Sequence, residues 1–504
     1  MAFLGTKDFE QYDIAAPLPS AMVESFRAFG YDIGTAIADL IDNSITAGAN
    51  NVWLIFCWDG SDSWISIRDD GRGMSQPELI NAMRLGSRNP LDKREPNDLG
   101  RFGLGLKTAS FSQCRCLTVK TKAGGEDLIT RRWDLDYINQ TGEWRLLHTE
   151  DSGSMSKLLG LESLSSGSVV LLEKLDRVVE EAKASDRKAH DNFLELTETV
   201  EKHLGMVFHR FLEEQILSIW INEQLVSFWN PFLSDENATQ MLPEEVFYVG
   251  EEKLTVQPYI LPHHSKIDQK MLDKAAGPRG WSAQQGFYIY RSDRLLVAGD
   301  WLDLGFQKEE HYRLARIQVD LPNTLDNAWD IDVKKSRARP PTSLKSDFKR
   351  IARLTRQRAM EVYRYRGKVL ISGNKEEHVF PWERIVKHGK VSYAINREHP
   401  IVKGVLDGSN KQEKIINALL RILEETVPVQ QIWLDSAKAP DSQSQAFETT
   451  PSVEVLEVMR QVYHSLCISG LSPVQSKQRL MTMEPFQRFK KLVDDLSTNY
   501  VEEL

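Results

Sequence analysis

The sequence predicts a mixed α+β fold spread over several domains. Met22, Val23 and Phe26 recur at the spacing of one apolar helix face. Apolar and polar side chains alternate over Trp64–Asp69, as in a half-buried strand. Further along, several such strands precede a long helix, and this order favours α+β organisation. A length of 504 residues predicts two to four domains.

Composition limits the class of protein. With 41% hydrophobic and 27% charged residues, the chain is expected to be soluble with well-formed cores. No apolar run of membrane-spanning length and no signal-peptide pattern is evident, and the four cysteines favour a reducing compartment, so we expect a cytoplasmic protein without membrane contacts. Cys114, Cys116, His263 and His264 lack partner ligands at metal-site spacing and are interpreted as structural.

The first motif lies on a helix predicted over Thr35–Ser44. Asp39 and Asn43 are four residues apart, so both project from one helix face. The neutral amide oxygen of Asn43 suits Mg²⁺, and the Asp39 carboxylate could take a proton from an attacking water. Asp42 lies about 100° away around the helix.

The second motif follows the strand predicted over Trp64–Asp69. Gly71 and Gly73 allow the backbone to turn tightly after Asp69 and to approach a ligand. A carboxylate at a strand end can accept a hydrogen bond from an exocyclic amine, although such a segment alone is also typical of a plain turn.

The third motif is glycine-rich and leads into a helix start at Leu106. Backbone N–H groups at such a place bind anions, and Gly103 and Gly105 would let them close on phosphate oxygens. The pattern is neither a Walker loop nor a Rossmann fingerprint.

Taken together, the segments Asp39–Asn43, Asp69–Gly73 and Gly100–Lys107 resemble the nucleotide-binding motifs of the GHKL ATPases. That family includes gyrase B, MutL, MORC proteins, large heat-shock chaperones and histidine kinases. The resemblance implies a Bergerat α/β sandwich over residues 1–180 that binds ATP with Mg²⁺ on Asn43. The binding residues it implies are Asn43, Asp69, Gly71, Gly73, Met74, Gly100, Arg101, Phe102, Gly103, Leu104, Gly105, Leu106, Lys107 and Ser168.

Within that family Asp69 would read adenine, Gly73 would line the base pocket, and Ser168, on a strand predicted from Gly167, would close it. The polar segment between Ser75 and Leu99 would be a lid over the triphosphate. The general base is usually Glu, whereas this chain has Asp39, which is one methylene shorter. Slow hydrolysis is therefore expected.

Residues 190–345 resemble the S5-like α+β transducer domain of MutL and MORC proteins. One lysine there would contact the γ-phosphate; Lys335 is the candidate, with Lys334 as the alternative, because adjacent strand residues face opposite ways. We assign 346–372 to a basic helix and linker, and 373–504 to a smaller α/β or helical C-terminal domain for oligomerisation or partner docking.

Charge bears on the partners. The net charge of −9 is not that of a general nucleic-acid coat, but residues 334–368 hold 13 Lys and Arg against Asp347 and Glu361. The basic segment is consistent with DNA binding or with a solvated helix balanced by acidic neighbours.

The resemblance is closest to MORC- and MutL-like proteins. It implies a Mg-ATP-dependent clamp or switch that dimerises through its ATPase domain and acts on DNA. Partner proteins would include a separate nuclease or helicase, and DNA processing or phage defence would be the setting. The alternative is a chaperone-like ATPase that clamps a protein client.

Overall fold

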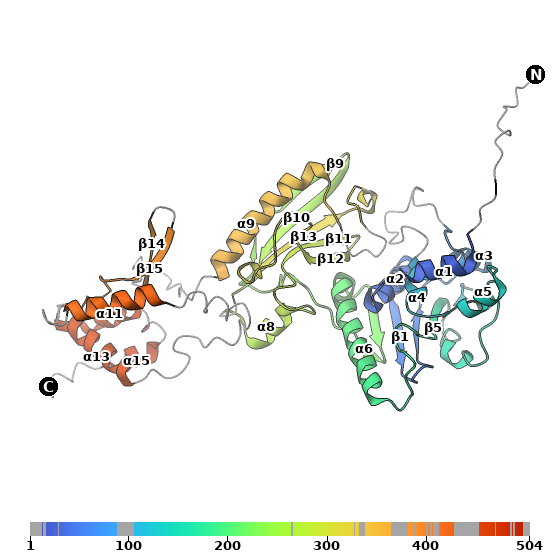
Figure 1. The fold of residues 1–504 in the computed structure, drawn as a ribbon, viewed down its shortest axis with the longest axis horizontal. Helices are drawn as coiled ribbons and strands as arrows, with labels where there is room; N and C mark the ends of the chain where they lie inside the picture. The colour runs from blue at the N-terminus through green and yellow to red at the C-terminus, as the bar shows by residue number, and fades with distance from the viewer. Residues whose placement is uncertain are drawn as a thin grey trace, which may run out of the picture. The chain divides into compact units, whose positions relative to one another are not determined.

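The computed structural model describes residues 13, 17–28, 30–87, 105–263, 266–326, 328–331 and 338–363, and shorter stretches between 382 and 496. The chain divides into two compact units, Met1–Gly367 and Lys368–Leu504 (Figure 1). Among the helices described, none is both long enough and apolar enough to span a bilayer.

The first unit contains a seven-stranded sheet in the order β4-β3-β5-β2-β1-β6-β7. β1 and β6 pair in parallel, and the other neighbouring strands are antiparallel. Its strands are β1 (Asn51–Cys57), β2 (Trp64–Asp69), β3 (Cys116–Lys122), β4 (Ile129–Asp134), β5 (Gly167–Glu173), β6 (Ser218–Ile221) and β7 (Gln224–Leu225).

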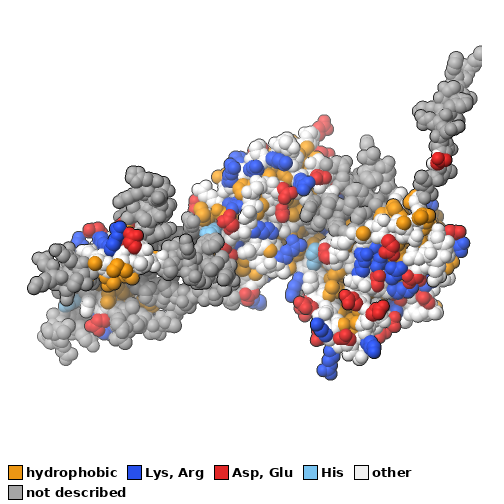
Figure 2. Space-filling model, in the orientation of Figure 1, with side chains coloured by type: hydrophobic (Ala, Val, Ile, Leu, Met, Phe, Trp, Pro, Cys, Tyr) orange, Lys and Arg blue, Asp and Glu red, His pale blue; other side chains and the backbone are white. Residues whose placement is uncertain are grey.

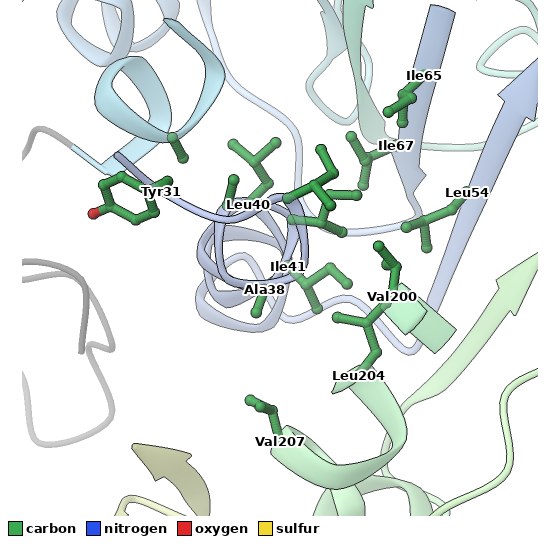
Figure 3. Close-up of a cluster of buried hydrophobic side chains, with 14 of the residues drawn as sticks. Tyr31, Ala38, Leu40, Ile41, Leu54, Ile65, Ile67, Val200, Leu204 and Val207 are labelled. Atoms are coloured by element: carbon green, nitrogen blue, oxygen red, sulfur yellow. The ribbon is translucent and has the colours of Figure 1, made fainter. Parts of the chain in front are cut away.

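Helices pack on one face of this sheet and build the main core. They include α1 (Pro19–Arg27), α2 (Ile33–Thr46), α4 (Gly105–Phe111) and α6 (Arg187–Val207). Figure 3 shows α2 in the middle of the core; Leu54, Ile65 and Ile67 of the strands lie to its upper right, and Val200 and Leu204 of α6 lie below these residues on the same side. The alternation along β2 that predicted a strand thus places its odd-numbered residues beneath α2.

The opposite face of the sheet carries a smaller apolar cluster. Val169 and Leu171 of β5 pack there with Leu158 and Leu161, beside the 3₁₀ helix Met155–Leu158. α5 (Leu135–Thr141) follows β4 directly.

Two local expectations need correction. From its residue type Ser20 would be expected to cap the first helix, but α1 begins at Pro19 with Leu18 at its N-cap, so Ser20 lies inside the helix. The segment after Ser75, expected as one long loop, begins with α3 (Gln76–Met83). Ser75 and Glu78 form a reciprocal capping box, which explains why a helix starts there.

The sequence over 216–226, with Asn222 and Glu223 at its turn, predicts a hairpin. The structure confirms this hairpin, which extends the first sheet. β6 and β7 are joined by Asn222 and Glu223, both with positive φ (45° and 70°), as a tight two-residue turn requires. β6 follows α6 and the short α7 (His209–Glu213).

A second sheet of six strands follows in the same unit. Its order is β12-β11-β13-β10-β8, and β9 pairs with β10. The strands are β8 (Gln240–Met241), β9 (Glu245–Val249), β10 (Glu252–Ile260), β11 (Gly286–Arg291), β12 (Arg294–Asp300) and β13 (Ala315–Leu321), and α8 (Gln269–Ala276) lies between β10 and β11 in the chain.

The predicted basic helix is α9 (Lys345–Tyr363), which packs against β10 and β13 (Figure 1). The apolar residues of this segment predict one buried helix stripe. Phe348, Ile351, Ala352 and Ala359 are buried accordingly, whereas Leu354 is half exposed and does not belong to the stripe.

The alternation of apolar and polar residues from Trp329 onward also predicts a strand over 329–336. Trp329 and Asp330 lie instead in a turn, and residues 332–337, including both candidate lysines Lys334 and Lys335, lie outside the described residues.

The two sheets share apolar and polar contacts. Tyr288, Tyr290 and Leu295 of the second sheet belong to the same buried cluster as α2 and α6. The Tyr290 hydroxyl and His209 Nε2 are 2.8 Å apart, and both residues are buried. The second sheet is therefore packed onto the first through the ends of α6 and α7.

The second unit has its own small core of Met459, Tyr463, Leu480, Phe486 and Val493, with Met483. Its elements are the hairpin β14 (Trp382–Lys387) and β15 (Lys390–Ile395), α11 (Glu413–Thr426), α13 (Val453–Ile468), α14 (Pro473–Met481) and α15 (Lys490–Asp494).

Candidate functional site

α2 carries the first motif, and its start is fixed by a cap. The Asp32 carboxylate accepts a hydrogen bond from the Thr35 N–H at 2.9 Å, which satisfies an otherwise open helix donor. Asp39 and Asn43 share a face, as predicted, and the Asn43 amide nitrogen donates to the Asp39 carbonyl oxygen at 3.2 Å. Asn43 is exposed, and its amide oxygen takes no part in that bond.

The carboxylates of α2 meet an arginine from the second sheet. Asp39 and Asp42 are both buried, and Arg294 Nε donates to both Asp42 oxygens at 3.1 Å. Arg294 Nη2 also lies 3.5 Å from Asp39 Oδ1. The candidate general base is therefore in an ion-pair cluster that joins the two sheets.

Asp69 ends β2 on the face covered by α2. It continues the inward positions of Ile65 and Ile67, so the strand period turns its carboxylate under the helix. Ser44 Oγ donates to one carboxylate oxygen at 3.0 Å, and the Gly71 N–H donates to the other at 3.0 Å. The carboxylate is thus held in place from both α2 and the following turn.

A polar row continues from Asp69 across two neighbouring strands. Asp69 pairs in register with Ser168 on β5, and Ser168 pairs with Thr121 on β3. The Ser168 and Thr121 hydroxyls are 2.9 Å apart, and Thr121 Oγ1 accepts from the Met74 N–H at 3.0 Å. Asp69, Ser168 and Thr121 therefore form one continuous polar row across β2, β5 and β3.

The glycines of the second motif are required by close backbone approach. Gly73 has φ of +67°, and a Cβ there would lie 2.0 Å from the Lys122 carbonyl oxygen. A Cβ on Gly71 would lie 2.9 Å from Ala47 Cβ. A side chain at either position would push the turn away from β3 and α2.

Burial dominates the titration of Asp69. Loss of solvation raises the pKa of its carboxyl to about 6, against the lowering effect of hydrogen bonds from Gly71, Ser44 and Ser168. At neutral pH the group is mainly ionised and acts as an acceptor only.

The third motif is described in part. Residues 100–104 lie outside the described residues, with Gly100, Arg101, Phe102, Gly103 and Leu104 among them, as does the lid segment from residue 88 onward. Gly105, Leu106 and Lys107 begin α4. Lys107 is buried, and its amine donates to the Ala82 carbonyl oxygen at the end of α3 at 2.8 Å.

Cys114, just before β3, and Cys116, the first residue of β3, are both buried. Burial raises the pKa of Cys116 to about 12 and that of Cys114 well above its usual value, so both thiols stay protonated. Across the part of the chain that the structure describes, no group of three or more His, Cys, Asp or Glu side chains could hold a metal ion. His263 is buried, and His264 lies outside the described residues.

Sequence reasoning missed Ser44, Thr121 and Arg294. Thr121 follows Leu117 and Val119 on the inward face of β3, so strand alternation could have found it. Arg294 is 252 positions from Asp42, and no local pattern links them.

Comparison with known proteins agrees with this geometry. Residues 31–163 match the family described as "Histidine kinase-, DNA gyrase B-, and HSP90-like ATPase". A stretch of 91 residues is 33% identical to the ATPase morc-1 of Caenorhabditis elegans, and it covers 18% of this chain and 10% of that relative. The alignment thus spans about a tenth of that relative's length.

Residues 31–163 are therefore similar to the GHKL ATPases, in agreement with the resemblance seen in the motifs, and they lie in a fold of mixed α and β structure. Within that class the chain is similar to the MORC ATPases.

The raised pKa of Asp69 predicts a pH-dependent effect of Asp69→Asn on stability. A carboxyl whose pKa is about 6 when folded and 3.8 as a model group stabilises the fold below pH 3.8, and that contribution is lost as pH rises through 6. Asparagine carries no such charge. Relative to wild type, the variant should gain about 2 kcal/mol between pH 4 and pH 8. Urea unfolding at both pH values measures this; an equal difference at the two would contradict the assigned pKa.

Proposed function

We propose that this chain is a Mg-ATP-dependent clamp or switch of the MORC- and MutL-like kind, which dimerises on binding ATP and acts on DNA with partner proteins. The observation that carries the ATP site is the Asp69 carboxylate, buried at the end of β2 and oriented by Ser44 and Gly71. An ionised acceptor held in this way suits the exocyclic amine of adenine. Ser168 and Thr121 would continue the base pocket.

Asn43 is suited to be the single protein ligand of Mg²⁺. Its side chain is exposed at the edge of the buried helix, and its amide oxygen is not used in the bond to Asp39. Mg²⁺ commonly takes one or two protein oxygens and completes its shell with phosphates and water. When bound, the ion would neutralise charge on the phosphate oxygens.

Asp39 is the proposed general base. It shares the helix face of Asn43, so it would lie on the same side of the nucleotide as the metal ligand. Its side chain is shorter than that of the usual glutamate, and its carboxylate is close to Arg294. The shorter side chain favours slow turnover, which suits a switch.

The second sheet is proposed as the transducer. It packs onto α2 and α6 through a shared core, so a movement of α2 on nucleotide binding would be transmitted to the second sheet. Lys335, with Lys334 as the alternative, is proposed to sense the γ-phosphate. Gly100–Leu106 and Lys107 are proposed to contact the phosphates when the lid closes.

α9 is the proposed DNA-facing element. Lys345, Lys349 and Arg353 recur every fourth residue and are exposed, which gives one basic row along the helix; Figure 2 shows Lys and Arg side chains gathered along α9. Such a row can neutralise successive phosphates.

Arg356 has a different position on the same helix. It is buried, with its guanidinium 3.8 Å from the Tyr312 ring centroid and 4.8 Å from that of Phe306. It also donates to the Gln307 carbonyl oxygen and pairs with Glu309. We therefore leave Arg356 out of the DNA-binding row, because its replacement would disturb packing.

ATP turnover by the whole chain tests the enzyme part of the proposal. Asn43→Ala should remove Mg²⁺-dependent ATP hydrolysis, and Asp39→Asn should lower kcat by about 10²-fold or more while nucleotide stays bound. Phosphate release and equilibrium binding of ATP measure these two effects.

Asn139→Ala, an exposed asparagine on α5, is the matched control and should behave as wild type. Wild-type turnover in the Asn43→Ala variant would refute the assignment of the site.

DNA binding tests the second part. The triple variant Lys345→Gln, Lys349→Gln, Arg353→Gln should bind DNA more weakly, and the slope of log K against log salt should fall by about 3. Arg350→Gln with Arg358→Gln is the control, since Glu245 and Glu361 already pair with these arginines. An unchanged slope in the triple variant would contradict the DNA-facing role, and ATP-dependent capture of an unfolded protein without DNA affinity would favour the chaperone-like alternative.

A further inference from the structure

Side-chain contacts join the hairpin that carries Arg294 to α7. Ser292 and Asp293 form its two-residue turn with positive φ (46° and 65°), so Arg294 opens β12 immediately after the turn. Arg210 of α7 pairs with Asp293 at 3.0 Å and with Asp320 of β13, and its guanidinium lies 3.7 Å from the Tyr290 ring centroid. These contacts fix where the Arg294 side chain enters.

That side chain reaches the acidic face of α2 in a dry environment. Arg294, Asp39 and Asp42 are each at most 3% exposed. The Arg294 guanidinium lies 5.9 Å from the Phe208 ring centroid, and Nη1 donates to the Leu295 carbonyl oxygen at 3.0 Å. The guanidinium is thus anchored on its own strand and spans both carboxylates.

Charge near the cluster is supplied by arginine and not by histidine. His203 of α6 is close enough to Arg294 for the positive charge to contribute to its titration, but burial is the main reason that the pKa of His203 falls to about 4. His203 is therefore neutral at pH 7 and adds no positive charge to the cluster.

The geometry within the cluster is unequal. Arg294 makes hydrogen bonds to Asp42, whereas its contact with Asp39 is a longer approach of 3.5 Å. Asp42 therefore holds the guanidinium in place. The guanidinium in turn orients Asp39 through one longer contact and does not form a bidentate pair with it.

We propose that Arg294 is a positioning residue for ATP hydrolysis: it orients the Asp39 carboxylate from the second sheet, so that turnover requires β12 to be docked on α2. This inference rests on the function proposed above. It gives the second sheet a direct connection to the base, separate from any lysine that contacts the phosphates. A shift of the hairpin would change turnover without contacting nucleotide.

Arg294→Gln and Arg294→Lys test the proposal in the full chain. The Gln variant should lose about 10²-fold in kcat, because a displaced base is out of line with its water. Its KM for ATP and its affinity for a non-hydrolysable ATP analogue should stay within about threefold of wild type, because the polar row of Asp69, Ser168 and Thr121 is unchanged. The Lys variant should recover part of kcat, since it keeps the charge but lacks the planar fork.

Arg291→Gln is the matched control. Arg291 lies on the same hairpin and is equally buried, but it pairs with Asp326 at 2.8 Å inside the second sheet. This variant should lower the urea midpoint and leave kcat of the folded protein near that of wild type. If both arginine variants lower kcat equally, Arg294 has only a structural role and the proposal is wrong.

A double-mutant cycle gives a readout that does not depend on turnover. The urea midpoint of Arg294→Gln combined with Asp42→Asn should fall by less than the sum of the two single shifts, because each change removes the other's partner. Additive shifts would show that the cluster is uncoupled and would overturn the proposal. An inactive wild type would refute the proposed function itself, whereas an active wild type with unchanged kcat in Arg294→Gln would refute only this inference.

Discussion

Burial of the acidic face of α2 is the constraint on which the rest of the structure depends. The helix is enclosed by the first sheet and α6, yet it carries Asp39 and Asp42 into that interior. Buried carboxylates without a counter-charge cost several kcal/mol each. Arg294 supplies a counter-charge from β12. The position of the candidate base therefore depends on the second sheet being folded and packed against α2.

The same helix also holds the other end of the site. Ser44 lies five residues after Asp39 and donates to Asp69, which fixes the acceptor at the end of β2. Asn43 is left exposed between these two anchored positions. One helix therefore sets the spacing between the proposed base pocket, the proposed metal ligand and the proposed general base, and the sheet beneath it adds Ser168 and Thr121.

Local patterns predicted the parts of this site that depend on local physics. The alternation over Trp64–Asp69 and the glycines that follow specify a strand and a tight turn, and both occur where expected. Helical spacing correctly placed Asp39 and Asn43 on one face. The capping box of Ser75 and Glu78 could have predicted α3 from the sequence. The polar and proline-rich stretch that follows favoured a loop instead.

Long-range partners could not be predicted in this way. The Arg294–Asp42 pair joins segments 252 positions apart, and a lone arginine in a strand pattern does not indicate where its charge will be matched. Arg356 presents the converse case: in sequence it is one of many basic residues on a helix, but Tyr312 and Phe306 enclose it. Only the packing of α9 on the second sheet separates this buried arginine from the exposed row.

Base selectivity tests the central claim most directly, because it depends on the buried Asp69 acceptor. Competition binding of ATP and GTP to the full chain, at pH 7.5 with Mg²⁺, measures it. Adenine presents a donor to the carboxylate, whereas guanine presents an acceptor oxygen that would leave the buried charge unsatisfied. The account predicts that ATP binds at least about 10²-fold more tightly than GTP. Equal affinity for the two nucleotides would contradict it.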